Sequence, residues 1–292
     1  MRLTMMRSGE IPELFILTDD DRHVRVADLL KAADTVPFRV YDPEHPALTD
    51  IFRSGDVSTN LTWLEQRAAT ALEASVDGWS WAVPDTGGSL YCVGRNYAAH
   101  AAELGNKVPG KPMFFMKSRG CLAANQATVT RPPSSDRVDY EGELALIIGE
   151  PLRGPIDDLQ ARKSIVAVTL LNDISDRAEQ NKAKEAGKPW FRAKARIGFA
   201  PMGPWLRTVS ESRDLREFTY QTLLNGTVVQ DGDPSLWLWD AVTVVRDLSE
   251  TSGLEAGDII ATGTPAGVGP MQVGDVVAVT SSEIGTLRTL IG

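Results

Sequence analysis

The chain has 292 residues and a mass of 31.7 kDa, and we expect a medium-sized domain with a smaller partner domain. Apolar residues make up 42% and charged residues 24%, which is typical of a globular protein with a packed core and excludes a disordered or fibrous chain. A net charge of -9 without a dense Lys/Arg block argues against nucleic acid as a partner.

The N-terminal stretch MRLTMMRSGEIPELFIL has no uninterrupted apolar segment before a small-residue cleavage site. No later run reaches the roughly 18 apolar residues of a membrane span. We therefore expect a cytoplasmic protein with no membrane partner. Cys92 and Cys121 are too few for a disulfide framework or a thiolate metal cage, and their small and apolar neighbours predict inert packing.

Residues 1–85 are predicted to form a small N-terminal α/β domain. Helical periodicity is expected over residues 23–33 (HVRVADLLKAA) and 61–75 (LTWLEQRAATALEAS), with loops rich in Asp and Pro between them. Pro84 and the pair Gly87-Gly88 predict a turn that ends this domain.

Short strands dominate residues 86–292. The expected strands are SLYCVGRNY (89–97), MFFMK (113–117), LALIIG (144–149), IVAVTLL (165–171), YQTLLNG (220–226), DIIATGT (258–264) and VVAVT (276–280). Two helices are expected, over 175–187 and 236–250. Because strands and helices do not alternate regularly, the sequence predicts an α+β, mainly β domain and not a βαβ array.

Two carboxylates stand at the head of one strand, in VDYEGELALIIGE (138–150). Side chains alternate along a strand, so Glu141 and Glu143 should point to one side and the following leucines to the other. Two unpaired carboxylates on a core strand repel each other and are costly to desolvate unless a cation neutralises them. The alternative is an edge strand on which both face water.

A third carboxylate favours the cation. In VTLLNDISDR (168–177) an apolar strand ends at Asp173, before a Ser-capped helix, so this side chain can reach a cleft. Three carboxylates without Cys or clustered His favour Mg²⁺, with Mn²⁺ or Ca²⁺ as alternatives, and disfavour zinc. The sequence thus predicts a metal site formed by Glu141, Glu143 and Asp173.

Three further residues have the chemistry of an active site. On a helix His100 and Glu103 share a face at i, i+3, so the carboxylate could orient the imidazole, although such a pair is often a surface pair. Lys194, among small and aromatic residues, could complement an enolate near a metal or be an ordinary solvated lysine. The turn DIIATGTPAGVG (258–269) resembles a phosphate-binding loop but lacks the Lys-Ser/Thr of a P-loop, which disfavours nucleotide binding. Its N–H groups and the Thr264 hydroxyl could equally hold a substrate carboxylate.

Seven blocks, in this order, resemble the fumarylacetoacetate hydrolase family over roughly residues 88–285, in its acylpyruvase-like or 2-hydroxyhepta-2,4-diene-1,7-dioate isomerase-like branch. The blocks are VGRNYAAHAAE (93–103), FFMKS (114–118), DYEGELALIIG (139–149), NDISDRAEQ (172–180), AKARIGFAPMGPW (193–205), LNGTVVQDG (224–232) and LEAGDIIATGTPAGVG (254–269).

The resemblance implies a mixed β-sandwich roll, a homodimer, and Mg²⁺ or Mn²⁺ on two Glu and one Asp, which match the three carboxylates above. The family's His-Glu dyad matches His100 and Glu103 on a lid helix, so residues 95–110 are expected to close over ligand. Lys194 matches a catalytic lysine. The expected substrate-binding residues are Arg95, Tyr97, Lys117, Arg177, Gln180 and Thr264.

Several positions depart from the family pattern, among them Ala178 where Asp is usual and Ala195 where Ser is usual. Asp176 stands where Ala is usual, and Glu283 where Gly is typical. Arg196 replaces a common Phe, and Arg119 follows FFMKS where small residues are commoner. The two additional arginines suggest a more anionic substrate than a simple acylpyruvate.

The expected reaction is hydrolysis of a C–C bond in a 2,4-dioxo acid (an acylpyruvate, a fumarylacetoacetate-like acid or a diketo sugar acid) to a 2-oxo acid and a carboxylic acid. His100 would take a proton from water, and Lys194 would stabilise the oxyanion. The alternatives are a metal-dependent decarboxylase or isomerase of a 2-oxo or 2-hydroxymuconate-type diacid, and a non-catalytic metabolite-binding protein. In each case the partner is a small anionic 2-oxo acid.

Overall fold

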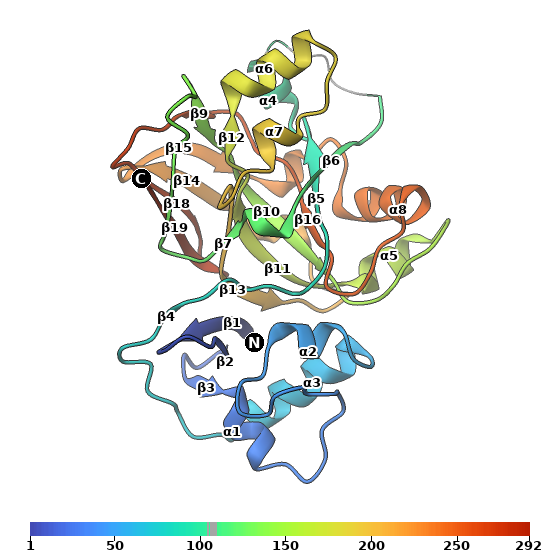
Figure 1. Ribbon diagram of the computed structural model, residues 1–292. Coiled ribbons are helices and arrows are strands. Elements are labelled where there is room, and N and C mark those ends of the chain that lie inside the picture. Colours follow the sequence, from blue (N-terminus) through green and yellow to red (C-terminus); the bar gives the residue numbers. More distant parts are fainter. Residues whose placement is uncertain (104, 106–109) are drawn as a thin grey trace.

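The structure is a computed structural model that describes residues 1–103, 105 and 110–292 (Figure 1). A large β-rich body contains most of the strands, and a smaller N-terminal body lies beneath it. The predicted α+β, mainly β fold is confirmed. Residues 104 and 106–109 of the expected lid lie outside the described residues.

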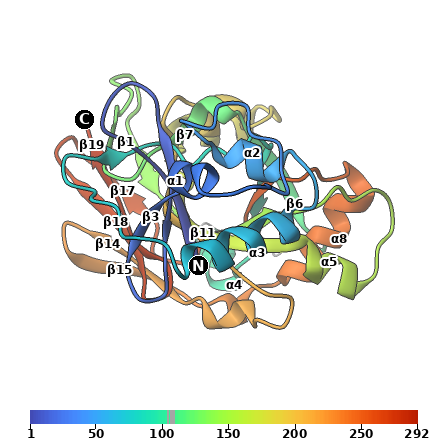
Figure 2. The ribbon, with the colours of Figure 1, turned by 90° about the horizontal axis from the view of Figure 1, so that it is seen from below.

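The N-terminal body combines short strands with three helices that lie against them (Figure 2). The elements are β1 (Arg2–Arg7), β2 (Glu13–Leu17), β3 (His23–Arg25), α1 (Val26–Lys31), α2 (Leu48–Phe52), α3 (Val57–Ala68) and β4 (Ser80–Trp81). The helix predicted over 23–33 begins only at Val26. Residues 23–25 form a strand because buried Val24 alternates with two partly exposed neighbours and the segment pairs with β2.

One large sheet runs through both bodies. Its order is β3-β2-β1-β13-β11-β10-β16-β5-β6. Outside this order, β4 pairs with β1 and β7 pairs with β13. The strands added here are β5 (Leu90–Gly94), β6 (Met113–Lys117), β7 (Leu122–Ala123), β10 (Gly142–Ile148), β11 (Ile165–Asn172), β13 (Ala200–Thr208) and β16 (Ile259–Ala261). The bodies join where β1 pairs antiparallel with β13, Leu3 opposite Leu206. The domain boundary at residues 85/86 stays a prediction, since the sheet crosses it.

Two smaller sheets complete the β-roll. A five-stranded sheet has the order β15 (Thr227–Gly232), β14 (Tyr220–Leu224), β18 (Val276–Ser281), β19 (Gly285–Ile291), β8 (Ala127–Val129), and a three-stranded sheet the order β12 (Ser175–Asp176), β9 (Val138–Tyr140), β17 (Gly269–Pro270). Leu144 and Leu146 of β10 share an apolar core with Val279 and Leu287 of the five-stranded sheet. Ala145 and Ile147, on the other face, belong to a core that extends into the N-terminal strands. The central strand is therefore buried on both sides.

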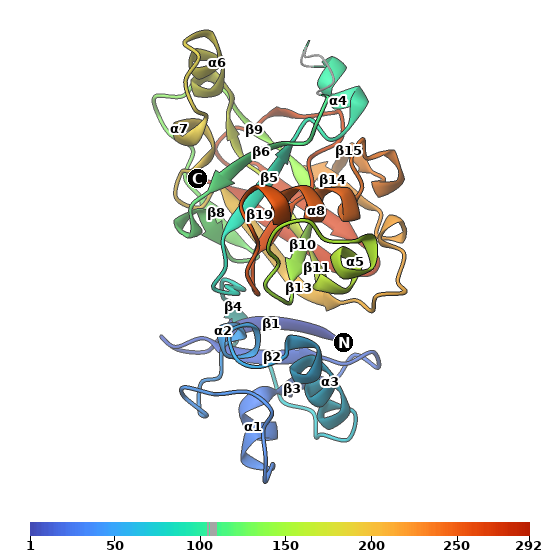
Figure 3. The ribbon, with the colours of Figure 1, turned by 90° about the vertical axis from the view of Figure 1, so that its right-hand side faces the viewer.

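The remaining helices flank the roll. They are α4 (Ala98–Glu103), α5 (Asp158–Ser164), α6 (Arg177–Glu185), α7 (Phe191–Lys194) and α8 (Ala241–Thr251), with short 3₁₀ turns at Arg119–Cys121, Leu215–Glu217 and Pro234–Leu236. Asp176 and Asp240 cap α6 and α8 by accepting from the backbone N–H groups of Glu179 and Thr243, which explains where these two predicted helices begin. Helices α4, α6 and α7 gather at the end of the roll opposite the N-terminal strands (Figures 1 and 3).

Two expectations from composition can be compared with the structure. In the described part of the chain, no helix is both long enough and apolar enough to cross a membrane. Cys92 and Cys121 are both buried and form no disulfide, as inert packing predicts.

Candidate metal centre and active site

The strand register brings the predicted acidic residues together. Strands β10 and β11 pair antiparallel with Gly142 opposite Asn172, so the start of one strand lies beside the end of the other. The backbone N–H of Asp173 donates to the Glu141 carbonyl oxygen at 2.8 Å. Residues 32 positions apart in the chain, 141 and 173, therefore become neighbours.

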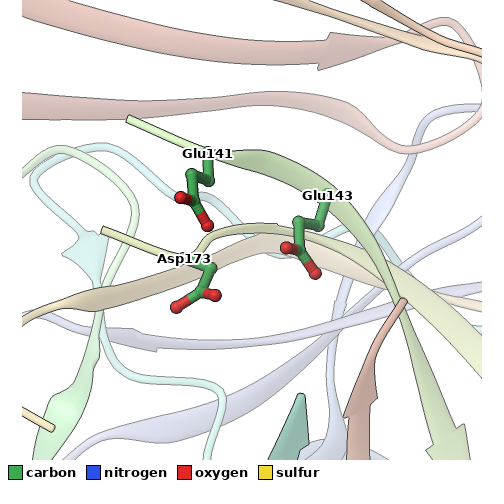
Figure 4. A group of neighbouring side chains, drawn as sticks. All are labelled: Glu141, Glu143 and Asp173. Atoms are coloured by element: carbon green, nitrogen blue, oxygen red, sulfur yellow. The ribbon is translucent and has the colours of Figure 1, made fainter. Parts of the chain in front are cut away.

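Gly142 fixes the direction of the two glutamates. A Cβ atom at this position would lie 2.0 Å from Thr222 Oγ1 and 3.2 Å from Val279, on the side of the five-stranded sheet. Glu141 and Glu143 point the other way, toward Asp173 (Figure 4). One oxygen from each of the three carboxylates lies within 4.8 Å of the others, and the three residues are only 1–4% exposed.

Two lysines lie against this acidic cluster. Lys194 Nζ of α7 is 2.7 Å from Glu141 Oε2 and 2.5 Å from Asp173 Oδ2, and Lys117 Nζ of β6 is 2.5 Å from Asp173 Oδ1. Burial opposes the charge of Lys194, but Asp173 and Glu141 outweigh it and raise the pKa of the ammonium. Lys194 is therefore a permanent cation at neutral pH and not a base.

Glu143 differs from its two neighbours. Burial would raise the pKa of Glu141, but Lys194 and Arg177 hold it well below its usual range. Glu143 forms no ion pair within the described residues; its carboxylate accepts from the Gly263 N–H at 2.8 Å. Burial, then Asp173 and Glu141, raise its pKa. An all-oxygen cluster with one uncompensated carboxylate fits a hard divalent cation.

The predicted dyad lies beside the cluster. His100 is 6% exposed, and its Nδ1 is 3.4 Å from Glu103 Oε2. Glu103 is held in turn by the Gly267 N–H at 3.0 Å. Burial lowers the pKa of His100 in spite of the nearby Glu141 and Glu103. The imidazole is thus neutral at pH 7 and able to accept a proton.

Helix α6 contributes a polar wall. Arg177 bonds to Asp139 at 2.9 Å and to Gln180 at 2.6 Å, and it also contacts Glu141. In the loop after β16, the Thr264 hydroxyl donates to the Gly142 carbonyl oxygen at 2.9 Å. These bonds fix the orientation of the side chains around the acidic cluster.

The cavity above the cluster has about 30 Å³ of open space, room for no more than a few water molecules. Nine predicted residues line it: Arg95, His100, Glu141, Glu143, Asp173, Arg177, Gln180, Lys194 and Thr264. Larger hollows of about 690 and 560 Å³ lie elsewhere, but neither contains a buried carboxylate cluster. A substrate therefore needs movement of the walls, of which α4 is one.

Three predicted residues do not line the cavity. Glu103 lies behind His100, and Lys117 lies behind Asp173, where its ammonium also donates to the Ile174 carbonyl oxygen at 3.1 Å. Tyr97 is 3% exposed and forms a backbone bridge with Trp237.

Six lining residues were not predicted: Met113, Phe115, Lys184, Trp190, Val93 and Gly94. The first two alternate with Lys117 along β6, and Lys184 follows Arg177 and Gln180 at helical spacing, so both patterns contained a usable signal.

The two additional arginines, which suggested a more anionic substrate, do not line the cavity. Arg119 is 2.5 Å from Asp85, and Arg196 is 2.7 Å from Asp176. Asp176 is buried, and a buried carboxylate needs a partner. Two departures from the family pattern thus compensate each other. Glu283, in the turn between β18 and β19, lies 3.5 Å from Arg213.

A β-roll with a buried carboxylate cluster of this kind is typical of metal-dependent enzymes. Residues 89–291 match the family described as fumarylacetoacetate (FAA) hydrolase C-terminal, and the chain belongs to this family. It is 33% identical over 217 residues to a 2,4-didehydro-3-deoxy-L-rhamnonate hydrolase from Sphingomonas, covering 71% of this chain and 75% of the relative. It is 35% identical over 191 residues to an oxaloacetate tautomerase from Escherichia coli, covering 65% and 87%.

Among solved structures, the chain is similar to fumarylpyruvate hydrolase from Pseudomonas aeruginosa in complex with Mn²⁺ and pyruvate. The TM-score is 0.64 at 30% identity, with 70% of this chain and 88% of that chain covered. These relatives act on small acids, but they include both hydrolases and a tautomerase. Family membership therefore does not distinguish hydrolysis from tautomerisation, and the geometry of the site has to do so.

Proposed function

We propose that this protein is a Mg²⁺- or Mn²⁺-dependent hydrolase that cleaves a C–C bond in a 2,4-dioxo acid to a 2-oxo acid and a carboxylic acid. The observation that carries the proposal is His100, a buried neutral imidazole held by Glu103 beside the acidic cluster. A decarboxylase or tautomerase needs no base to activate water, whereas a hydrolase does.

Glu141, Glu143 and Asp173 would hold the metal ion. The oxygen-only donor set and the uncompensated charge of Glu143 support this assignment, as does the Mn²⁺ in the related fumarylpyruvate hydrolase. When bound, the cation would stabilise the negative charge that develops on the 2-oxo acid as the C–C bond breaks.

The protein's own residues would move the protons. His100, oriented by Glu103, takes a proton from water through Nε2, and the hydroxide adds to the carbonyl carbon at position 4. The bond between carbons 3 and 4 then breaks, which releases the carboxylic acid and the enolate of the 2-oxo acid. The imidazolium returns its proton to carbon 3. Lys194, cationic throughout, stabilises the oxyanion.

The remaining polar residues would bind and orient the substrate. Arg95, Arg177, Gln180 and Thr264 line the cavity and suit this role. Lys117 has a different role in the proposal, because its ammonium is 2.5 Å from Asp173 and lies outside the cavity lining. It positions a ligand of the metal and does not touch the substrate.

A second candidate function is decarboxylation or tautomerisation of a small 2-oxo diacid. It is supported by the oxaloacetate tautomerase relative and by the small volume of the cavity. A non-catalytic metabolite-binding role has less support, because simple binding requires neither the His100–Glu103 pair nor a permanent cation at Lys194. A homodimer stays a prediction.

The test is a pair of rates on His100→Ala, with Mg²⁺ present. Hydrolysis of an acylpyruvate should fall about 10²- to 10⁴-fold, the usual contribution of a positioned general base. Turnover of oxaloacetate should largely survive, since the metal ligands are untouched. His45→Ala is the matched control, because His45 also pairs with a carboxylate three residues away, Asp42, at 3.0 Å, but lies in the N-terminal body.

Two results would contradict the proposal. Equal losses with both substrates would mean that His100 does not act mainly on water, and no loss with either would favour the second candidate function. Excess chelator should abolish hydrolysis, and added Mg²⁺ or Mn²⁺ should restore it. Full activity in chelator would refute the metal assignment.

A further inference from the structure

Lys184 lines the cavity but has no part in the reaction proposed above. It lies on α6 at i+7 from Arg177 and i+4 from Gln180, so the three side chains share one face of the helix. Arg177 is neutralised by Asp139 and Glu141. Lys184, in contrast, forms no ion pair anywhere in the described chain. Its ammonium lies 5.5 Å from the centroid of the Trp190 ring, at the cavity wall.

Arg95 is a second cation of this kind. It follows β5 and has φ = 60°, a left-handed backbone conformation that non-glycine residues rarely adopt. Such strain is retained where the surroundings require it and is concentrated at functional sites. Arg95 lines the same cavity, and over residues 1–103, 105 and 110–292 it has no carboxylate partner. The two cations that lack partners thus face one cavity from different elements.

Their proximity has an electrostatic cost. Burial, then Arg177 and Arg95, lower the pKa of the Lys184 ammonium, which shows that these like charges converge. Glu141 offsets them only in part. Lys117, Lys194 and Arg177 already pair with two carboxylates of the acidic cluster, and a divalent cation would compensate the third. Lys184 and Arg95 therefore lack a counter-anion among the described residues, and a bound ligand could supply one.

We propose that Lys184 and Arg95 bind a second carboxylate of the substrate, at the end distant from its 2-oxo acid group, so that the natural ligand is a diacid. Phe115 and Trp190, which line the cavity between charged residues, offer an apolar surface for the carbon chain. This inference rests on the proposed function and specifies its substrate class. The sequence suggested an anionic substrate on the basis of Arg119 and Arg196; Lys184 and Arg95 now supply that charge from inside the site.

The test compares two five-carbon ligands of Mn²⁺-loaded protein by titration calorimetry: 2-oxoglutarate and 2-oxopentanoate, which differ in the terminal carboxylate. The wild-type protein should bind the diacid at least about 10-fold more tightly, as expected of one charge-assisted hydrogen bond. Lys184→Gln should reduce this preference to less than about 3-fold, whereas Lys184→Arg should retain it. Lys182→Gln, an exposed lysine on the same helix, is the matched control and should behave as wild type.

Arg95→Gln provides a second variant and should also reduce the preference. The proposal is overturned if the wild-type protein shows no preference for the diacid, including the case in which it binds neither ligand, or if the preference survives Lys184→Gln. Binding separates this inference from the reaction. If His100→Ala leaves hydrolysis unchanged while Lys184→Gln still abolishes the preference, the hydrolase assignment fails and the diacid site stands.

Discussion

Replacing Glu143 with Gln should stabilise the metal-free protein and weaken its metal binding, two effects of opposite sign. Glu141 and Asp173 each have a cation within hydrogen-bonding distance, whereas Glu143 has only the Gly263 N–H among the residues described. Without metal, its charge is buried beside two like charges. With metal, the same charge is a ligand.

The magnitude follows from the spacing of the carboxylates. Two charges 4.8 Å apart repel by about 3.5 kcal/mol at an effective dielectric constant of about 20. Partial protonation of Glu143 reduces this repulsion in the wild-type protein. We therefore expect Glu143→Gln to increase the free energy of unfolding by about 1–3 kcal/mol when chelator is present. Mn²⁺ at 100 times its Kd should stabilise the wild-type protein by about 2.7 kcal/mol, but a variant with 100-fold weaker binding by only about 0.4 kcal/mol.

The pH dependence has a defined sign. The folded-state pKa of Glu143 lies above its ordinary value of 4.5, so its contribution to stability is fully present below pH 4.5 and is lost as pH rises through the folded pKa. The advantage of Glu143→Gln should therefore be larger at pH 8 than at pH 5. Chemical denaturation in chelator at both values measures it.

Glu141→Gln is the matched control. It removes a carboxylate whose buried partners are Lys194 and Arg177, and breaking buried ion pairs costs about 3–5 kcal/mol, so this variant should be destabilised without metal. If Glu143→Gln were also less stable than wild type in chelator at pH 8, or bound Mn²⁺ equally well, the reasoning about the uncompensated carboxylate would be refuted.

Three other predictions concern His100, the Arg196–Asp176 ion pair and helix α4. Because burial lowers the pKa of His100, the acid limb of kcat/KM for hydrolysis should have its midpoint below pH 6.5; a midpoint above 7 would contradict the assignment. Arg196→Met should cost about 1–2 kcal/mol in denaturant unfolding, because it leaves the buried Asp176 without its cation, and no change would mean that the pair is not stabilising. Amide exchange in residues 98–103 should slow when Mn²⁺ and oxalate bind if α4 is a lid, and equal exchange would argue against closure.

Local sequence patterns were sufficient to predict the direction of side chains along a strand and the position at which a strand ends. The two-residue period directed Glu141 and Glu143 to one side, and the polar end of the strand at Asn172 marked the position of Asp173. That these segments are neighbours depends on the register of β10 and β11, which no local pattern contains. The family resemblance supplied that information.

Other features depend on tertiary contacts alone. Lys117 was expected to face substrate, yet it lies behind Asp173, since strand alternation defines a side but not the depth at which a long side chain ends. Arg119 and Arg196 were interpreted as evidence of a more anionic substrate because their partners, Asp85 and Asp176, are remote from them in sequence. The position of Lys184 in the site, in contrast, could have been predicted from sequence, because Lys184 follows Arg177 at helical spacing.

The pairing of β1 with β13 has a consequence for the edges of the molecule. In the large sheet β13 lies between β11 and β1. Strand β7 pairs with the start of β13, at Ala200 and Pro201, whereas β1 of the N-terminal body covers the edge of β13 at Leu206 and Arg207. A truncated chain that begins after residue 85 would leave this long, buried strand with an open edge, and open edges template intermolecular pairing. We therefore expect the N-terminal residues to protect the edge of β13 from intermolecular strand pairing and so to reduce aggregation. This role is independent of any contribution to the reaction at the other end of the roll.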